Sequence, residues 1–282
     1  MHCAWEAFIK MLPVRLRDEV DRLGKNTLQE LRLRVGYPVE LVTRNKILYL
    51  DKTVVNDDLT HCIHFVTQFS PWTAETVGQG YITAPGGHRV GVFGRYAQRK
   101  DDSWLLQTPS MLSLRVARDF PGIASQADVQ SGSVLIIGIP GAGKTTLLRD
   151  LIRQYSNSGS GNISVIDERE EIFPQYKGMH CFSPGIHTDV LSGCKKYVGI
   201  EWALRNMTPS VIAVDEITAK SDCDAMLQAG WCGVRLFATA HAGSKEDLLT
   251  RPVYEPIVKH NLFQTILVMR PDKSWYVERM NI

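Results

Sequence analysis

The amino-acid sequence predicts an α/β protein in which a smaller α/β domain precedes a larger one built around a parallel sheet. Beyond about residue 120, short continuous apolar runs alternate with segments of helical periodicity, as in sheets buried on both faces. Before it, several short runs alternate apolar with polar residues, as half-buried strands do. The length of 282 residues also favours two domains.

The first 25 residues predict an amphipathic helix, because Trp5, Phe8, Ile9 and Leu12 are spaced for one face. Pro13 either opens a second turn or breaks this helix. We expect the apolar stripe to pack in a core; binding to a membrane surface is the alternative. The remaining elements expected before residue 120 are strands at 31–35, 38–42 and 47–50, a helix at 60–69, a hairpin over 78–96 and a strand at 113–118.

Residues 119–132 are polar and interrupted by glycine and proline, which marks a domain boundary. We therefore expect an N-terminal α/β domain over residues 1–120 and a second domain over residues 121–282. A helix with apolar spacing follows the first apolar run of the second domain. The buried strands expected there are 134–137, 163–166, 211–214 and 236–240.

Composition narrows the function classes. The net charge of +2 and the absence of a strongly basic block weigh against a nucleic-acid partner. The six cysteines form no C-x-x-C pair, which weighs against zinc and favours reduced thiols. No stretch approaches the roughly 18 apolar residues of a spanning helix, so we expect no transmembrane segment and, at a membrane, only a peripheral subunit.

The strongest motif is GIPGAGKTT at residues 138–146, which fits the phosphate-binding pattern G-x-x-x-x-G-K-[ST] between a buried strand and a helix. Its backbone N–H groups and the helix N-terminus are expected to wrap phosphates. Lys144 would reach the β- and γ-phosphates, and Thr145 would ligate Mg²⁺. The predicted binding residues are Gly138, Ile139, Pro140, Gly141, Ala142, Gly143, Lys144, Thr145 and Thr146.

A second motif is the apolar strand 211–214 followed by Asp215 and Glu216, a Walker B pattern. Asp215 would hold the water shell of the Mg²⁺ ion, and Glu216 would orient and deprotonate the attacking water. The alternative is a strand that ends in two solvated acids. Because both acids are present, we expect hydrolysis rather than binding alone.

Two further strand ends carry polar residues. Residues 167–171 are DEREE, and either Glu168 or Glu171 would reach the nucleotide or its water, since ligands gather at the carboxyl ends of parallel strands. A solvated acidic loop is the alternative. His241 follows the strand 236–240 and is a candidate sensor of the γ-phosphate, or else an ordinary structural histidine.

Arginines of the N-terminal domain are candidates for a cation that one subunit supplies to its neighbour, as oligomeric ATPases often require. They are Arg89, Arg95 and Arg115, all on expected strands. Each one alone also fits an ordinary surface charge.

The chain resembles the family of stage III sporulation protein AA, ATPases related to those of type II and type IV secretion. The resemblance covers nearly the whole chain. The phosphate loop is shared by many families, whereas DEREEI, HTDVL and TPSVIAVDEI in that order are far more specific. The segments that carry it are LRLRVGYPVEL (31–41), QGYITAPGGHRVGVFGR (79–95), SLRVAR (113–118), GIPGAGKTTLLRDLIR (138–153), VIDEREEI (165–172), HTDVLSGC (187–194), NMTPSVIAVDEI (206–217) and FATAHA (237–242).

This resemblance implies a RecA-like P-loop ATPase domain behind the smaller domain, with ATP and Mg²⁺ at its site. It implies a homo-oligomeric ring, expected to be a hexamer, in the mother-cell cytoplasm. The ring would dock on a membrane channel subunit between mother cell and forespore and energise assembly of, or transport through, that channel. In such rings DEREEI matches the acidic box, TAHA the histidine box, and N-terminal arginines complete the site.

The sequence departs from the family pattern at two positions. His187 stands where an arginine is expected, and Ser192 stands where an aspartate is expected. Both departures alter the local charge near that loop and leave the ATPase assignment in place.

Two other functions remain alternatives. One is a RecA-like ATPase acting on single-stranded nucleic acid, against which the lack of an aromatic and arginine cluster weighs. The other is a nucleotide-gated scaffold with negligible hydrolysis.

Overall fold

A computed structural model describes residues 1–67, 80–99, 104–127 and 132–280. Parts of three expected features therefore lie outside the described residues. They are the end of the helix at 60–69, the first two residues of the hairpin at 78–96, and residues 128–131 of the expected boundary.

The chain forms two compact units. The first comprises Met1–Asp119 and Pro174–Phe182, and the second comprises Phe120–Phe173 and Ser183–Ile282. Residues 174–182, which the sequence placed in the second domain, thus group with the first unit. They form a short hairpin, β9 (Gln175–Tyr176) and β10 (Met179–His180), beside the turn at Gly87. A methyl group at Gly87 would lie only 2.9 Å from Pro174 Cγ, so the close approach depends on a glycine there.

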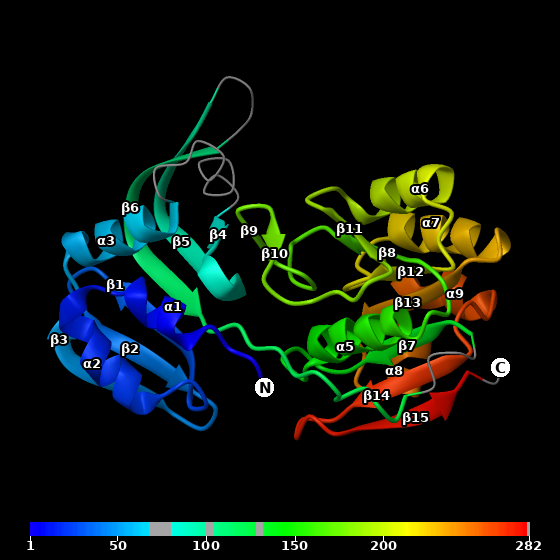
Figure 1. The fold of residues 1–282 in the computed structure, drawn as a ribbon, viewed down its shortest axis with the longest axis horizontal. Helices are drawn as coiled ribbons and strands as arrows, with labels where there is room; N and C mark the ends of the chain where they lie inside the picture. The colour runs from blue at the N-terminus through cyan, green and yellow to red at the C-terminus, as the bar shows by residue number, and fades with distance from the viewer. Residues whose placement is uncertain (68–79, 100–103, 128–131, 281–282) are drawn as a thin grey trace. The chain divides into compact units, whose positions relative to one another are not determined.

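The first unit is an antiparallel sheet in the order β3-β2-β1-β6-β5-β4 (Figure 1). The strands expected at 31–35, 38–42 and 47–50 form, the hairpin over 78–96 forms over its described residues, and the turn at residues 44–46 connects β2 to β3 as predicted. The strand expected at 113–118 ends at Arg115 and is the last part of a longer strand, β6. The strands are β1 (Leu28–Arg34), β2 (Pro38–Thr43), β3 (Ile47–Thr53), β4 (Tyr81–Thr83), β5 (Arg89–Gln98) and β6 (Trp104–Arg115), and the helices are α1 (Trp5–Lys10), α2 (Val14–Leu23), α3 (Asn56–Thr67) and the short η1 (Pro85–Gly87).

The amphipathic stretch at the N-terminus is two helices rather than one, because Pro13 lies between α1 and α2. Phe8 and Leu12 are buried, as is Leu16 in α2. They form one core with the apolar face of the sheet and with α3. The expectation that this stripe packs in a core is therefore confirmed.

The other face of the first sheet carries charged side chains. Glu30, Arg32 and Arg34 of β1 alternate with the buried Leu31 and Leu33, as the pleat of a strand requires. Arg32 pairs with both Glu30 and Glu40. This face therefore presents arginines held by partly buried carboxylates.

The second unit is a seven-stranded sheet in the order β11-β8-β12-β13-β7-β14-β15, in which only β15 is antiparallel. The four predicted strands are confirmed as β7 (Val134–Ile137), β8 (Ile163–Asp167), β12 (Val211–Val214) and β13 (Arg235–Ala240). Almost all residues of these strands are buried, as expected for a sheet that is covered on both faces. The strands not predicted are β11 (Thr188–Ser192), β14 (Thr265–Met269) and β15 (Trp275–Arg279).

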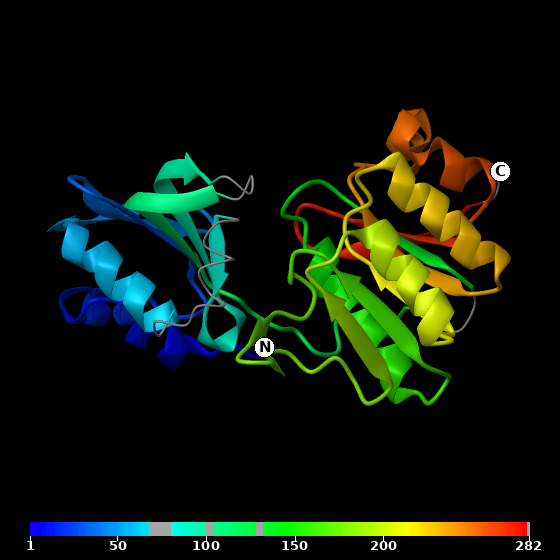
Figure 2. The same ribbon diagram turned by 90° about the horizontal axis from the view of Figure 1, so that it is seen from above.

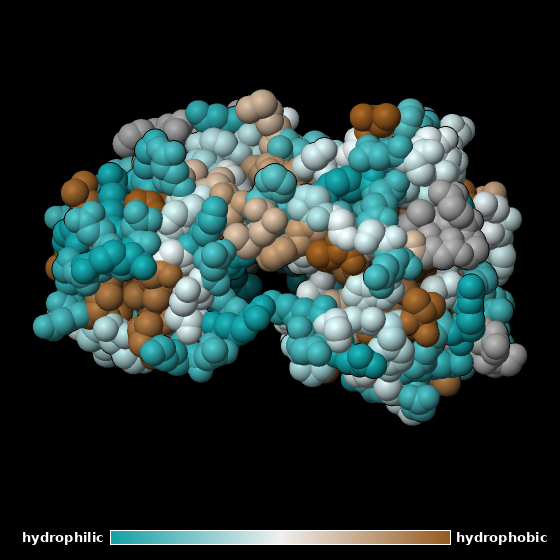
Figure 3. Space-filling view, turned by 60° about the horizontal axis from the view of Figure 1, so that its bottom comes forward, coloured by the Kyte–Doolittle hydropathy of each residue, from teal (hydrophilic) through white to brown (hydrophobic). Residues whose placement is uncertain are grey.

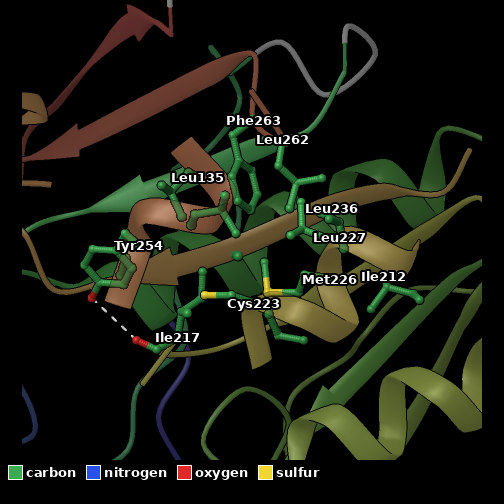
Figure 4. Packing of buried hydrophobic residues seen from close by; sticks show 14 of the residues in the cluster. Leu135, Ile212, Ile217, Cys223, Met226, Leu227, Leu236, Tyr254, Leu262 and Phe263 are labelled. Carbon is green, nitrogen blue, oxygen red and sulfur yellow. Dashed lines mark hydrogen bonds between the residues drawn. The ribbon is translucent and has the colours of Figure 1, made fainter. Parts of the chain in front are cut away.

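Helices lie on both faces of this sheet (Figures 1 and 2). Tyr155 of α5 packs edge-on against Phe237 on one face. The other face forms a core with α6, α7 and α9, in which Met226 and Leu227 of α7 lie near Leu236 of β13 (Figure 4). The helices are α5 (Lys144–Asn157), α6 (Lys196–Asn206), α7 (Lys220–Trp231), α8 (Lys245–Thr250), the short η2 (Pro252–Tyr254) and α9 (Glu255–Lys259).

The surface is mixed in character. In Figure 3 hydrophobic residues form small separate patches among hydrophilic ones on the face shown. Among the described residues, no helix combines the length and the apolar character that crossing a membrane requires.

Because β8, β12, β13 and β7 are neighbours and parallel, their carboxyl ends meet along one edge of the sheet. The glycine loop, the acids at 167–171, Asp215 with Glu216, and His241 follow these four ends. This topology brings the predicted site residues of the second unit to one place.

Candidate phosphate-binding and catalytic site

The loop between β7 and α5 has a backbone that needs its glycines. Gly141 and Gly143 have φ of 77° and 103°, in the left-handed region that glycine favours. A Cβ on Gly138 would lie 2.8 Å from Cβ of Met269, so the loop passes close to β14. Within the described part of the chain, no side chain caps α5, and its first N–H groups are available to an anion.

Lys144 opens α5 and turns back into the loop. Its Nζ donates to the carbonyl oxygens of Gly138 and Ile139 at 2.9 and 3.1 Å, and to Nδ1 of His241 at 3.0 Å. Burial lowers the pKa of Lys144, while the nearby Asp215 and Glu216 act in the opposite direction. A cation thus lies at the centre of the loop.

Thr145 and Asp215, the two predicted Mg²⁺ ligands, are in contact. The Thr145 hydroxyl donates to Oδ2 of Asp215 at 2.7 Å. The hydroxyl of Thr239 donates to the other carboxylate oxygen. Thr239 in turn accepts the N–H of Glu216 at 2.8 Å, so it also fixes the end of β12.

This set fits Mg²⁺. The ion usually takes one or two protein carboxylates and fills its remaining positions with phosphate oxygens and water. Asp215 and Thr145 supply such a partial set beside the loop. In the described ranges no group of three or more His, Cys, Asp or Glu side chains forms a metal-binding cluster.

Glu216 stands at a sharp change of backbone direction after β12. Its φ of 54° is unusual for a residue with a side chain, and such strain is often found at functional sites. Its carboxylate accepts from Nε2 of His241 at 2.8 Å and from Arg169 at 3.1 Å. The side chain remains 29% exposed, so water reaches it.

His241 connects the loop to Glu216. Because the Lys144 ammonium has only protons to offer, Nδ1 of His241 must accept, and Nε2 carries the proton donated to Glu216. The backbone N–H of His241 donates to the hydroxyl of Tyr254 at 3.1 Å. Lys144, His241 and Glu216 thus form one chain of hydrogen bonds across three strand ends.

Asp167, the first acid of the DEREE segment, shapes the loop rather than facing solvent. Its buried carboxylate accepts the N–H groups of Glu171, Ile172 and Phe173 at 2.8 to 3.0 Å. Burial, with a contribution from Asp215, raises the pKa of Asp167 to about 6 against the effect of these hydrogen bonds.

Glu168 lies at an open pocket between the ends of β8 and β12. Its Oε2 accepts from Nζ of Lys196 at 2.7 Å. Glu171, the other acid considered for this role, also lines the pocket. Lys144, Thr145, Asp215, Glu216, Glu168 and His241 therefore gather at one edge of the sheet.

The three candidate arginines lie in the first unit, whereas the residues above lie in the second. Arg89 and Arg95 are on β5, and Arg89 lies over the ring of Tyr81 with 4.0 Å between guanidinium carbon and ring centroid. Arg115 ends β6, is 68% exposed, and is 3.8 Å from Glu30. The three arginines therefore belong to a different unit of the chain from the other predicted site residues.

Three residues of the site were missed. Arg169 lies within the DEREE segment. Its position between two acidic residues was the only sign in the sequence that it could belong to the site. Lys196 and Tyr254 belong to no motif, and their positions follow from the packing of α6 and of η2. Nothing in the sequence around them indicates a partner.

The chain is similar in sequence to several known proteins. A sequence model of the family described as "Sporulation stage III, protein AA" matches residues 5–276. Stage III sporulation protein AA of Bacillus subtilis (strain 168) is 33% identical over 279 residues, covering 94% of this chain and 91% of that protein. The uncharacterized protein ycf45 of Cyanidium caldarium is 29% identical over 181 residues, covering 60% of this chain and 52% of that protein.

Two solved structures share the fold. The ATPase DotB of Legionella pneumophila is 17% identical with a TM-score of 0.54, covering 95% of this chain and 80% of that chain. The pilus retraction motor PilT with bound ADP is 17% identical with a TM-score of 0.64, covering 93% of this chain and 80% of that chain. These likenesses establish the predicted fold class, an α/β chain with the RecA-like ATPase fold.

Proposed function

Because the chain belongs to the sporulation stage III protein AA family, we propose that it is an ATPase working as a homo-oligomeric ring, a hexamer. The ring would energise assembly of, or transport through, the channel between mother cell and forespore. It would act in the mother-cell cytoplasm, docked on a channel subunit at the membrane. The fold it shares with an ATPase and with an ADP-bound motor supports the reaction class.

One observation carries the catalytic part of this proposal. The phosphate loop, a hydroxyl and carboxylate pair suited to Mg²⁺, and a water-accessible carboxylate held by a histidine converge at one sheet edge. Binding alone needs only the loop. A second carboxylate beside it, held by hydrogen bonds and open to water, is what hydrolysis adds.

The loop residues 138–146 would bind the phosphates of ATP through backbone N–H groups and through Nζ of Lys144. Thr145 and Asp215 would hold Mg²⁺, which when bound neutralises phosphate charge. In the protein alone, Lys144 donates to the carbonyl oxygens of its own loop. We expect it to exchange these partners for phosphate oxygens.

Glu216 would orient the attacking water and take its proton on the carboxylate. His241 holds one oxygen of this carboxylate and Arg169 the other, so the group keeps a fixed direction. Glu168, across the pocket, would contribute a second acceptor for water.

The ring part of the proposal rests on the arginines. Arg89 and Arg115 face each other across β5 and β6, on the side of the first sheet that faces away from its helices. Arg95 lies further along β5 and is exposed. We propose that one of the three completes the site of a neighbouring subunit in the ring.

The proposal is tested by measuring ATP turnover and solution mass together. We expect steady turnover that is lost in Lys144→Ala, and a mass that rises to about six chains with a non-hydrolysable ATP analogue. Steady wild-type turnover that Lys144→Ala retains in full would contradict the loop assignment. A chain that stays monomeric at every nucleotide and protein concentration tested would contradict the ring.

The nucleic-acid alternative gives a different result. Tight binding of single-stranded DNA that weakens steeply with added salt would favour an ATPase acting on nucleic acid. We expect weak binding instead. Nucleotide binding without steady turnover in the wild type would favour the nucleotide-gated scaffold.

A further inference from the structure

Lys196 is a buried cation whose ammonium reaches the edge of the candidate site. Its side chain is 9% exposed, and Nζ donates to Oε2 of Glu168 at 2.7 Å. We propose that Lys196 is a positioning residue that holds the carboxylate of Glu168 toward the nucleotide site. This inference rests on the ATPase function proposed above, and it gives the HTDVLSGC segment a role.

The segment HTDVLSGC delivers Lys196 to this place. Strand β11 pairs in parallel with β8, and its last residue, Ser192, is in register with Asp167. The chain then turns at Gly193, whose N–H donates to the carbonyl oxygen of Asp167 at 3.3 Å. Helix α6 begins at Lys196, so its first side chain lies beside the end of β8.

Close packing keeps the first turn of α6 against β8. A Cβ on Gly199 would lie 2.5 Å from Cγ2 of Ile166 and 2.9 Å from Sγ of Cys194. Ile166 is fully buried in β8, so a larger residue at Gly199 would push α6 away from the strand. The position of Lys196 is therefore set by backbone packing and does not depend on Glu168.

The charges around the pocket explain why a cation is needed there. Five carboxylates line it, against two cations, Arg169 and Lys196. Arg169 is 59% exposed and is paired with Glu216. Lys196 is thus the buried cation among the lining residues, and it is the one that contacts Glu168.

Only one partner of this pair is buried: Lys196 is 9% exposed, whereas Glu168 is 34% exposed. Removing Glu168 leaves the buried ammonium of Lys196 uncompensated, whereas removing both charges costs less. Glu168 without Lys196 would turn toward solvent and away from the pocket. A purely structural lysine would affect stability but not turnover at saturating ATP.

The test uses the full chain, four variants of the pair and one control variant. Lys196→Met removes the cation, Lys196→Arg keeps it, Glu168→Gln removes the partner charge, and Lys196→Met with Glu168→Gln removes both. Lys195→Met is the matched control, since Lys195 is the exposed neighbour at the same helix start. Turnover with magnesium ATP and urea unfolding of the nucleotide-free chain are measured for each.

We expect Lys196→Met to lower kcat by about 10- to 100-fold, the usual cost of losing an orienting partner, with KM for ATP nearly unchanged. Lys196→Arg should recover most of this loss, and Lys195→Met should match the wild type. Glu168→Gln should add little loss in the Lys196→Met background, because the two residues act as one unit. Wild-type kcat in Lys196→Met, or equal losses in Lys196→Arg and Lys196→Met, would overturn the inference.

The unfolding measurements keep this inference distinct from the proposed function. We expect the shifts in urea midpoint of the two single variants to be non-additive in the double variant, whether or not the chain hydrolyses ATP. Additive shifts would overturn the pairing of Lys196 with Glu168. If instead the wild type hydrolyses no more ATP than Lys144→Ala, the ATPase proposal fails while the unfolding cycle still decides the pairing.

Discussion

His88 is a buried histidine that joins two backbone segments of the first unit. Its Nδ1 accepts the N–H of Ala117 at 3.0 Å, so its Nε2 proton is donated to the carbonyl oxygen of Ala4 at 2.9 Å. Burial lowers the pKa of His88 to about 4, and the positive charge of Arg118 acts in the same direction. The folded chain therefore keeps this ring neutral under mildly acidic conditions.

We predict that His88 destabilises the folded chain progressively as the pH falls from about 6.5 to about 4. The unfolded chain binds a proton at His88 near pH 6.5, whereas the folded chain resists it until about pH 4, so acid favours unfolding. A shift of this size corresponds to roughly 3 kcal/mol. Urea unfolding is measured across this range.

The control for this prediction is His88→Asn, which lacks the titrating ring. Its stability should depend less on pH than that of the wild type between pH 6.5 and 4. Asp167, whose pKa is raised to about 6, contributes with the opposite sign in both chains and cancels in the difference. Equal pH dependence of the two chains would contradict the prediction.

Among single residues, the sequence predicted those candidate site residues that directly follow a strand recognisable as an apolar run. The loop residues, with Asp215, Glu216 and His241, follow directly from strands that the apolar runs identify, so their meeting at one edge was foreseeable. Lys196 was not, because 28 residues separate it from Glu168 and only the pairing of β11 with β8 brings them together. The same holds for Tyr254, whose hydroxyl contacts depend on packing.

Strands β12 and β13 are joined at their carboxyl ends by one side chain. The hydroxyl of Tyr254 accepts the N–H of His241 at 3.1 Å. It donates to the carbonyl oxygen of Ile217 at 3.4 Å, the hydrogen bond drawn in Figure 4. Ile217 follows Glu216 directly. Tyr254 thus holds the backbone next to Glu216 at a fixed distance from the backbone of His241.

We predict that Tyr254→Phe lowers kcat several-fold while KM for ATP stays within a factor of about two, because the hydroxyl of Tyr254 contacts the backbone beside His241 and Glu216. Stability should fall by about 1 kcal/mol, the usual value of such a hydrogen bond. Turnover and urea unfolding measure the two effects. Tyr49→Phe, at an exposed position on β3, is the control and should match the wild type.

Among the strands of the second unit, those predicted correctly are strands that the sheet buries on both faces. Strands β7, β8, β12 and β13 are continuous apolar runs and were predicted. Strand β14 has the same pattern, TILVM, and was recognisable in principle. Strand β11, TDVLS, is only partly buried at the sheet edge, so neither an apolar run nor a clear alternation marks it.

At the scale of the whole molecule, the proposed ring requires a residue from one subunit at the site of the next. We predict that chains carrying Glu216→Gln and chains carrying an arginine variant restore turnover when mixed. Each chain supplies what the other lacks, so interfaces with an intact Glu216 and an intact arginine become active. Random mixing in equal amounts should restore roughly a quarter of wild-type turnover in a closed ring.

The mixing experiment is run separately with Arg89→Ala, Arg95→Ala and Arg115→Ala. Each arginine variant alone and Glu216→Gln alone are the controls, and Lys144→Ala mixed with Glu216→Gln should restore nothing, since both residues are expected to act within one chain. No recovery with any arginine variant, despite ring formation, would contradict a neighbour-supplied cation. Full turnover in all three variants alone would do the same.

The division of the chain into two units could be predicted only in part from the sequence. The polar stretch after residue 119 marks the change between the units, but residues 174–182 return to the first unit through the close contact at Gly87. A hairpin of four paired residues carries too little pattern to reveal its partner. Its placement follows from tertiary packing alone.

The central claim is hydrolysis of ATP with Glu216 as the group that activates water. Turnover and affinity for an ATP analogue, measured together in the wild type and Glu216→Gln, test it most directly. We predict that Glu216→Gln binds the analogue as the wild type does and turns over at least about 100-fold more slowly, as loss of a general base implies. Equal turnover in the two chains, or no turnover in the wild type, would contradict the claim.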